Sequence, residues 1–284
     1  MPVSEPLSTT PFFLRSKLLI LTVLLIGIWI PFQFWYGVWF GRDLTDEQLA
    51  IYLGSDSKQR LVQHALSQIG ESMIAGDPTV RQWYAHIAGL VDNPSTSLRA
   101  QAAWVMGQDN TSEIFHTTLL RNLKDPSPLV RRNSSLSLVK FKDQRAVHEL
   151  RQMLSPWIVT SPIQGKATLH AELKQWVHEN IDLVTITAPD GKTQSIRSEI
   201  GGQISEMRVK DGASVDASQP LLVLAANPEH AWEALRGLFL IGQESDLPWV
   251  QAYLDNVHHG EEIRAQAEST AAALRGRSDT PPEE

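Results

Sequence analysis

One stretch, residues 98–107, returns later in the chain, and this self-similarity constrains the fold more than any other feature. It reads Leu-Arg-Ala-Gln-Ala-Ala-Trp-Val-Met-Gly, and related stretches follow at residues 129–138 and 263–274. Each contains an apolar residue, an arginine, small residues and then apolar residues at helical spacing. A helix that recurs in this way is typical of a solenoid, in which each helical unit packs against the next.

The region 45–155 shows a helical pattern throughout. Thr45 and Gln48 form a capping-box sequence, in which each side chain satisfies the other residue's free N–H. Asp77-Pro78, Asn93-Pro94 and Asp125-Pro126 separate later helices, because proline at a helix start costs no hydrogen bond. The pattern predicts helices at about 58–75, 78–91, 95–107, 112–123, 128–140 and 143–154. Short helices joined by short turns indicate antiparallel pairs stacked as a solenoid.

The repeated stretch resembles the second helix of a HEAT-like repeat, of the kind also found in phycobilisome-lyase-type proteins. In such repeats an arginine commonly pairs with an aspartate in the preceding turn. The matching arginines here are Arg81, Arg99, Arg131 and Arg264, and the candidate aspartates are Asp77, Asp92 and Asp125. The resemblance implies that these arginines are structural rather than catalytic.

Residues 17–41 are predicted to be a transmembrane anchor after a cytoplasmic tail at 1–16. Leu18 to Gly41 contains no charged residue, and about 20 apolar residues cross a bilayer. Arg15 and Lys17 precede the run and acidic residues follow it, which favours a cytoplasmic N-terminus and a periplasmic or extracytoplasmic remainder, held at the inner membrane. The alternative is a cleaved signal peptide, although no small-x-small cleavage site follows. The residues expected at the membrane interface are Trp29, Trp35, Tyr36 and Trp39.

The segment 156–227 has a different residue pattern from the helical region before it. Residues 166–180 have apolar positions at helical spacing, which predicts one amphipathic helix. Strand signals then fill residues 182–226, and residues 202–224 resemble half of a biotinyl/lipoyl domain. The same half-barrel occurs in membrane-fusion proteins, which are periplasmic adaptors. Its expected turn residues are Gly201, Gly202, Asp211 and Gly212.

The lipoyl-like module departs from true carrier domains at one position. A carrier domain has a lysine after the strand equivalent to residues 221–224, where this chain reads Ala225-Ala226-Asn227-Pro228. We therefore expect no attached cofactor. The missing half of the barrel is expected from residues 157–165, from another protomer or from a partner, which makes the module a docking surface. The alternative is a self-contained domain that caps the solenoid.

Residues 228–275 restore the helical repeat, and 276–284 are predicted to be a disordered tail. The expected fold is therefore mainly α: a HEAT-like helical solenoid with a small inserted β module and one N-terminal transmembrane helix. The chain has no cysteine, which excludes disulfides and thiolate chemistry, and its net charge of −7 gives no basic footprint for nucleic acid. Motifs for nucleotide phosphates, zinc or a serine nucleophile are absent, so we expect no catalytic residue, cofactor or metal site.

The sequence favours a non-catalytic scaffold or adaptor in an envelope complex, similar to a secretion or efflux accessory protein. Its partners would be other envelope proteins, with a homo-oligomer left open. Solenoids expose long concave surfaces that suit protein partners. The alternative is an enzyme or an enzyme-maturation factor, as the lyase-type HEAT resemblance implies.

Overall fold

The computed structural model describes residues 27, 29, 43–54, 57–255 and 260–277. The chain divides into two compact units, Met1–Ile51 and Tyr52–Glu284. Near the end of the first unit, helix α2 (Asp46–Tyr52) begins with the predicted capping box. The Thr45 N–H donates to Gln48 Oε1 over 3.0 Å, and the Gln48 N–H donates to Thr45 Oγ1 over 3.4 Å.

The predicted anchor at 17–41 lies outside the described residues, apart from Gly27 and Trp29. Both of these are helical, and Trp29 is exposed. Trp35, Tyr36 and Trp39 are outside the described part of the chain, as are the predicted tails at 1–16 and 278–284. Among the helices that the structure describes, none has the length and apolar content needed to cross a bilayer.

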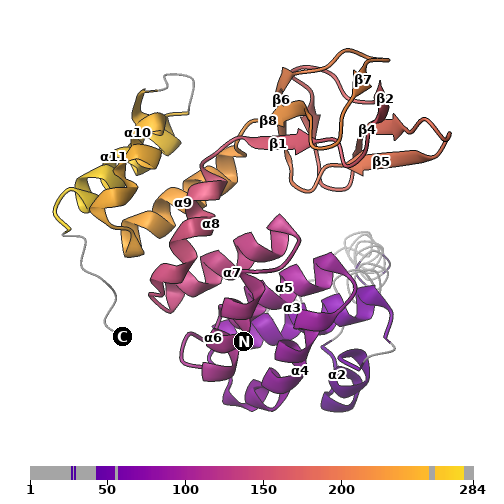
Figure 1. The fold of residues 1–284 in the computed structure, drawn as a ribbon. Coiled ribbons are helices and arrows are strands. Elements are labelled where there is room, and N and C mark those ends of the chain that lie inside the picture. The colour runs from indigo at the N-terminus through magenta and orange to yellow at the C-terminus, as the bar shows by residue number, and fades with distance from the viewer. Residues whose placement is uncertain (1–26, 28, 30–42, 55–56, 256–259, 278–284) are drawn as a thin grey trace, which may run out of the picture. The chain divides into compact units, whose positions relative to one another are not determined.

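The second unit begins with a stack of helices (Figure 1). Its first elements are α3 (Gln59–Ile74), the 3₁₀ helix η1 (Pro78–Trp83), α4 (Tyr84–Gly89), η2 (Leu90–Asp92), α5 (Thr96–Met106), α6 (Glu113–Asn122), α7 (Pro128–Lys140), η3 (Gln144–Ala146) and α8 (Val147–Met153). Helix α5 packs between α3 and α7, while α6 packs on α4 and α7. The predicted helix 78–91 is divided, because 3₁₀ turns form at both of its ends.

The helical repeat has a period of 32 residues. Arg99 and Arg131 occupy equivalent positions on α5 and α7, and Ile87 and Leu119 are equivalent buried residues of α4 and α6. The stack is also held by side chains that bond to the neighbouring helix. Ser137 Oγ, on α7, donates to the carbonyl of Ala103 on α5 over 2.8 Å.

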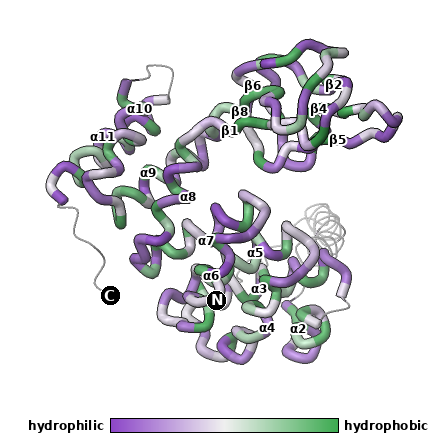
Figure 2. Tube along the Cα trace, viewed as in Figure 1, coloured by the Kyte–Doolittle hydropathy of each residue, from purple (hydrophilic) through white to green (hydrophobic). Residues whose placement is uncertain are grey.

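Strands rather than a helix follow α8. They are β1 (Trp157–Thr160), β2 (Gly165–Leu169), β3 (Trp176–Val177), β4 (Asp182–Thr187), β5 (Thr193–Arg197), β6 (Gly202–Met207), β7 (Ser214–Val215) and β8 (Pro220–Leu224). Two four-stranded sheets result, in the orders β1-β8-β6-β3 and β5-β4-β2-β7. One hydrophobic core joins the two sheets, and hydrophobic residues are concentrated in β4 and β8 (Figure 2). We call residues 157–224 the β module.

One prediction for this segment was wrong. Residues 166–180 were predicted to be a helix but form the β2–β3 region. Ala167 is fully buried opposite Ile186 in an antiparallel pair, while Leu173 and Trp176, which the helix would have buried, are exposed. The strands predicted at 182–226 are completed within the chain, since β1, β2 and β3 come from residues 157–177. The sequence left open whether residues 157–165, another protomer or a partner would supply the missing half, and both four-stranded sheets come from this chain.

The expected turn residues lie at separate points of the β module. Gly212 has a φ of +75°, a conformation that glycine adopts at little cost. The neighbouring Asp211 accepts a hydrogen bond from the Leu169 N–H over 2.9 Å. Gly202 begins β6 and pairs with Val177, and Gly201 directly precedes it. These four residues shape the module and form no common site.

The β module is inserted within one helical pair. Helix α9 (Pro228–Ile241) follows β8 directly, yet it packs on α8 and α7, which precede the module in the chain. Asn227 caps α9, because its Oδ1 accepts from the N–H of Glu229 over 2.9 Å. The elements η4 (Glu244–Asp246), α10 (Leu247–Asp255) and α11 (Glu261–Leu274) then extend the helical stack.

Candidate functional site

Two of the repeat arginines make the same contacts 32 residues apart. Arg99 Nη1 donates to the carbonyls of Asn93 and Pro94 over 2.9 and 3.3 Å. Arg131 Nη1 donates to the carbonyls of Asp125 and Pro126 over 2.9 and 3.0 Å. Each arginine therefore clamps the turn that precedes its own helix, which is a structural role.

The predicted carboxylate partners were partly wrong. Arg99 pairs with Asp125, which lies in the following turn rather than the preceding one, and Arg131 Nε bonds to Glu149 over 3.0 Å. Nη1 of each arginine donates to the carbonyl oxygens of the preceding turn. This leaves Nε free to bond to a carboxylate of the next repeat. Arg81 is exposed on η1, and Arg264 is exposed on α11 with no ion pair among the described residues.

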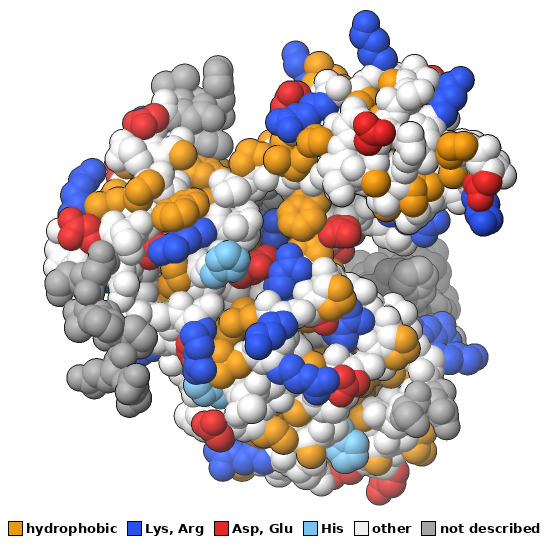
Figure 3. Space-filling model, in the orientation of Figure 1, with side chains coloured by type: hydrophobic (Ala, Val, Ile, Leu, Met, Phe, Trp, Pro, Cys, Tyr) orange, Lys and Arg blue, Asp and Glu red, His pale blue; other side chains and the backbone are white. Residues whose placement is uncertain are grey.

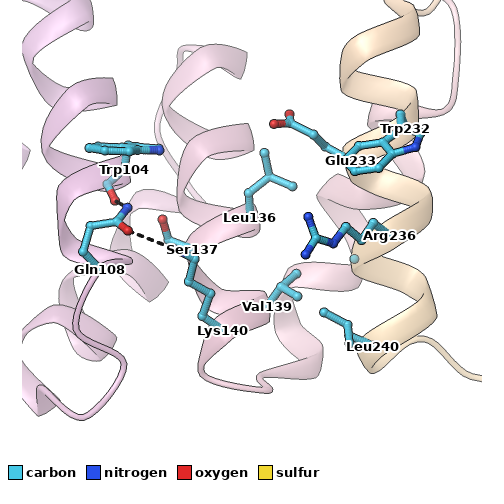
Figure 4. A pocket seen from close by; sticks show the side chains of 11 residues that line it. Trp104, Gln108, Leu136, Ser137, Val139, Lys140, Trp232, Glu233, Arg236 and Leu240 are labelled. Carbon is cyan, nitrogen blue, oxygen red and sulfur yellow. Dashed lines mark hydrogen bonds between the residues drawn. The ribbon is translucent and has the colours of Figure 1, made fainter. Parts of the chain in front are cut away.

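A hollow of about 260 Å³ lies where α5, α7 and α9 meet, and we call it the Trp104 groove (Figure 4). Its lining residues are Trp104, Gln108, Leu136, Ser137, Val139, Lys140, Trp232, Glu233, Arg236, Gly237 and Leu240. Gly237 permits the close packing of α9, since a Cβ there would lie 2.9 Å from a methyl carbon of Leu150. Because α9 packs on α7 and α8 across the inserted β module, residues more than 90 positions apart in the sequence line one groove.

Two indoles contribute to the apolar part of the groove. Trp104 is 47% exposed, and a Cβ at Gly70 on α3 would lie 3.1 Å from its ring. The ring therefore covers α3 on one side and leaves much of its surface open. Trp104 and Leu136 occupy equivalent positions of the repeat, where the pattern predicts side chains that face neighbouring helices and are buried. Trp104 does contact α3 but is not buried, and Leu136 is half-buried. Trp232 lies beneath Arg236, whose guanidinium carbon is 5.6 Å from the ring centroid.

Charged side chains border the indoles. Lys140 Nζ donates to Gln108 Oε1 over 3.1 Å, and Gln108 Nε2 donates to the Trp104 carbonyl over 2.8 Å. Loss of surrounding water lowers the pKa of Lys140. The same loss of water, together with the nearby Glu229 carboxylate, raises the pKa of Glu233. On the face in Figure 3, lysine and arginine side chains lie among apolar ones over the helices.

The groove combines aromatic faces, on which a flat ring can stack, with cations that can attract an acid. Indole faces stack on flat rings, while Lys140 and Arg236 can attract a carboxylate. Sequence reasoning assigned Trp104 and Leu136 to the repeat core and did not identify Lys140, Trp232, Glu233 or Arg236. The spacing of residues 232, 236 and 240 on one face of a helix was the available signal.

No other chemical centre stands out in the described ranges. Groups of three or more potential metal ligands do not occur among the residues that the structure describes. His116 Nε2 lies 2.7 Å from Asp143 Oδ2, but the Tyr84 hydroxyl bonds to Asp109 over 2.7 Å at the equivalent place one repeat earlier. The His116–Asp143 pair is therefore part of the repeat architecture.

The comparisons with known proteins agree with the helical architecture. A family model described as HEAT repeats matches residues 85–161, which is less than half of the chain. The match ends as β1 ends, and the insertion of the β module explains this limit. The coarse prediction of a mainly helical, HEAT-like protein is confirmed, while the resemblance to membrane-fusion adaptors receives no support. None of the curated proteins matches the chain.

A solved structure that resembles this chain is the complex of CpcE and CpcF of phycocyanin lyase from Nostoc sp. PCC7120. The identity is 17% and the TM-score is 0.45, over 82% of this chain and 66% of that chain. This chain thus spans just under two thirds of the length of its relative. At this level of similarity, neither a site nor a reaction transfers from one protein to the other.

The comparisons nevertheless correct two expectations. We expected a non-catalytic envelope adaptor and no enzyme, whereas the similar solved structure is a lyase complex. The adaptor is not retained, and the alternative drawn from the sequence is an enzyme or an enzyme-maturation factor. The chain is thus similar to HEAT-repeat proteins over residues 85–161 and, at low identity, to a subunit of a lyase.

Proposed function

We propose that this chain is a HEAT-type maturation factor of the lyase-like class. In this role it binds an aromatic or conjugated carboxylic acid in the Trp104 groove and presents the acid to a client protein. One observation carries the proposal: Trp104 and Trp232 line the same hollow as the cations Lys140 and Arg236. The HEAT-repeat match supports a protein partner, since solenoids of this kind commonly bind other proteins.

The two indoles would hold the flat part of the ligand. Trp104 is backed by α3 at Gly70, so its ring is fixed on one side while the other side is free to stack. A pocket for a whole drug-sized ligand has a volume of roughly 300–1,000 Å³. The Trp104 groove, at about 260 Å³, would therefore enclose one end of an extended molecule and leave the other end accessible to a client.

The charged residues would orient the acid. Lys140 and Arg236 lie on α7 and α9, so a carboxylate placed near them is held from two helices.

The same proposal includes the β module, which we take to be a self-contained domain that resembles a lipoyl domain. Both of its sheets come from this chain. After Leu224 the chain leads directly into the Asn227 cap of α9, and no lysine stands there. We therefore predict that the intact mass of the purified protein equals that of the polypeptide after ordinary end processing. An added mass of biotin or lipoate on any lysine would contradict this.

The groove can be tested with 8-anilinonaphthalene-1-sulfonate, an aromatic anion whose fluorescence rises in apolar sites. We expect Trp104→Ala and Trp232→Ala in the full chain each to weaken its binding about twofold to thirteenfold, from the loss of about 0.5–1.5 kcal/mol of aromatic stacking. Lys140→Gln should weaken binding and reduce its dependence on salt.

Trp176→Ala is the matched control. Trp176 is 45% exposed, close to the 47% of Trp104, but it lies on the β module outside the groove. Its removal should leave the affinity unchanged. Equal losses for Trp104→Ala and Trp176→Ala would show general surface adsorption and would refute the groove as a binding site.

A further inference from the structure

A buried arginine contacts two further helices at the point of the helical stack where the β module is inserted. The side chain of Arg132, on α7, is only 4% exposed. Its Nη1 lies 3.1 Å from Nδ1 of His230 on α9, and its Nε lies 4.0 Å from Oε1 of Glu149 on α8. Helix α8 precedes the β module and α9 follows it, so the Arg132–His230 contact joins α7 to the first turn after the insertion.

The preceding repeat shows that packing alone does not require this arginine. Ala100, on α5, lies 32 residues before Arg132 at the equivalent position, and it is also buried. A buried cation is costly unless its N–H groups are bonded. The hydrogen bond to His230 is the only one that the guanidinium makes within the part of the chain that the structure describes, and Nε has no partner there.

This hydrogen bond fixes the protonation state of His230. An arginine side chain has donors only, so Nδ1 of His230 is the acceptor and carries no proton. A proton on Nδ1 would replace the acceptor by a donor and place two cations in contact. The pKa of His230 is lowered from its ordinary value, first by burial and then by the charge of Arg132. The neighbouring Glu229 carboxylate acts in the opposite direction, with a smaller effect.

The other charged groups around the contact do not remove this conflict. Glu149 is already bonded to Arg131 Nε over 3.0 Å. Glu179, between β3 and β4, interacts with the charge of Arg132, but burial raises the pKa of Glu179, so it loses its negative charge at a higher pH than an ordinary glutamate. Acid therefore adds a positive charge at His230 and removes a negative one near Arg132, and both changes weaken the contact.

We infer that the Arg132–His230 contact is a pH-sensitive switch, which holds the first turn of α9 against α7 while His230 is neutral and releases that turn when His230 is protonated. Trp232 lies two residues further along α9 and lines the Trp104 groove. Release of the turn would displace this wall, so the groove would bind its acid at neutral pH and release it in acid. The effect on the ligand rests on the function proposed above, whereas the switch itself does not.

Amide hydrogen exchange of the full chain measures release of the turn. The opened turn takes up a proton on His230 below the ordinary pKa of 6.5, whereas the closed turn resists it. Opening should therefore become more frequent as the pH falls below that value. We expect the protection of residues 229–233, corrected for the intrinsic exchange rate, to fall at least about threefold between about pH 7.5 and about pH 5.

His230→Gln should abolish this pH dependence, because glutamine offers Arg132 an acceptor that does not titrate. His148→Gln is the matched control, since His148 is an exposed histidine of α8 outside the contact, and it should keep the full pH dependence. Protection that is the same at both pH values in the unaltered chain would overturn the inference, and so would an equal fall in folded His230→Gln.

Arg132→Ala decides if His230→Gln fails to fold. Alanine already fills the equivalent place at Ala100, and without the cation the protonation of His230 is no longer opposed. The variant should therefore lose the pH dependence of exchange in residues 229–233. Full pH dependence in Arg132→Ala would refute the switch.

The effect on the groove is measured separately, with 8-anilinonaphthalene-1-sulfonate. Between about pH 7.5 and about pH 5, we expect acid to weaken binding at least about threefold more in the unaltered chain than in His230→Gln. The comparison is needed because Glu233 also lines the groove and loses its charge in acid. Equal pH dependence in both proteins would refute control of the groove. Absence of binding at pH 7.5 would instead refute the function proposed for the groove, and the exchange data would still decide on the switch.

Discussion

Arg99 and Asp125 join two successive helical repeats through a two-point ion pair. Arg99 Nε donates to Asp125 Oδ2 over 2.8 Å, and Nη2 donates to Oδ1 over 3.0 Å. The two side chains are 12% and 8% exposed. Burial alone would raise the pKa of Asp125, but hydrogen bonds from Arg99 and the Ser127 N–H, with the charges of Arg99 and Arg131, lower it. The pair therefore remains ionised and fixes the spacing of the turns.

Arg99→Gln should destabilise the protein by about 2–3 kcal/mol, because hydrogen bonds to a charged partner are lost and Asp125 stays buried. The measurement is urea unfolding at neutral pH. Arg121→Gln is the control, since its pair with Asp92 is exposed and should contribute only about 0–1 kcal/mol. Equal losses in the two variants would show that burial of the Arg99 pair has no special weight.

The approach of α5 to α7 gives a second prediction. A Cβ on Gly107 would lie 2.3 Å from Ser137 Oγ and 3.1 Å from the Ser137 Cα, which cannot move without its backbone. Gly107→Ala should therefore cost about 1–3 kcal/mol by overpacking. Gly89→Ala offers a control, because nothing lies within 4 Å of a Cβ there. A Gly107→Ala variant as stable as Gly89→Ala would contradict the close packing of these helices.

The stability cost of truncating two aromatic residues of the helical region distinguishes a core side chain from a groove side chain. Phe115 is fully buried, and Phe115→Ala should cost about 3–5 kcal/mol through the cavity it leaves. Trp104 is 47% exposed, so Trp104→Ala should cost roughly half as much. Thermal unfolding of the two variants checks the order. A larger loss for Trp104→Ala would place its ring in the core after all.

The sequence was sufficient for features that depend on local pattern. The capping box at Thr45 and Gln48 and the recurrence of Arg99 at Arg131 required only short-range spacing. The β module was harder, because Leu169, Leu173, Trp176 and Val177 imitate a helical face while turns interrupt their strands. The Trp104 groove was harder still. Its walls come from α5, α7 and α9, and only the folded pairing of α8 with α9 across the insertion brings Trp232 towards Trp104.

The N-terminal anchor stays a prediction. The uncharged run from Leu18 to Gly41 should hold the full chain in the membrane fraction after an alkaline carbonate wash. Removal of residues 1–42 should release the remainder. A reporter fused after Glu284 should be active only if it functions outside the cytoplasm. A full chain that the carbonate wash extracts, or a fused cytoplasm-only reporter that is active, would contradict the anchor or its orientation.

The acid sensitivity of the helical repeat should depend on Asp143. Burial would raise the pKa of this carboxyl, but hydrogen bonds from the Arg145 side chain, the Arg145 N–H and His116, with the charge of Arg145, outweigh burial and lower the pKa to about 2. The ordinary value is 3.8. A carboxyl with a lowered pKa stabilises the fold above its unfolded value and loses that contribution as the pH falls through its folded value.

The contribution of Asp143 should therefore be complete above about pH 4 and disappear towards pH 2. We expect Asp143→Asn to be less stable than the unaltered chain at pH 7 but to lose less stability between pH 4 and pH 2. Urea unfolding at several pH values measures both effects. Asp190→Asn, at an exposed turn of the β module, should change the acid response little, because solvent screens its charge. If Asp143→Asn follows the same pH dependence as the unaltered chain, the hydrogen bonds from Arg145 and His116 do not couple this carboxyl to folding.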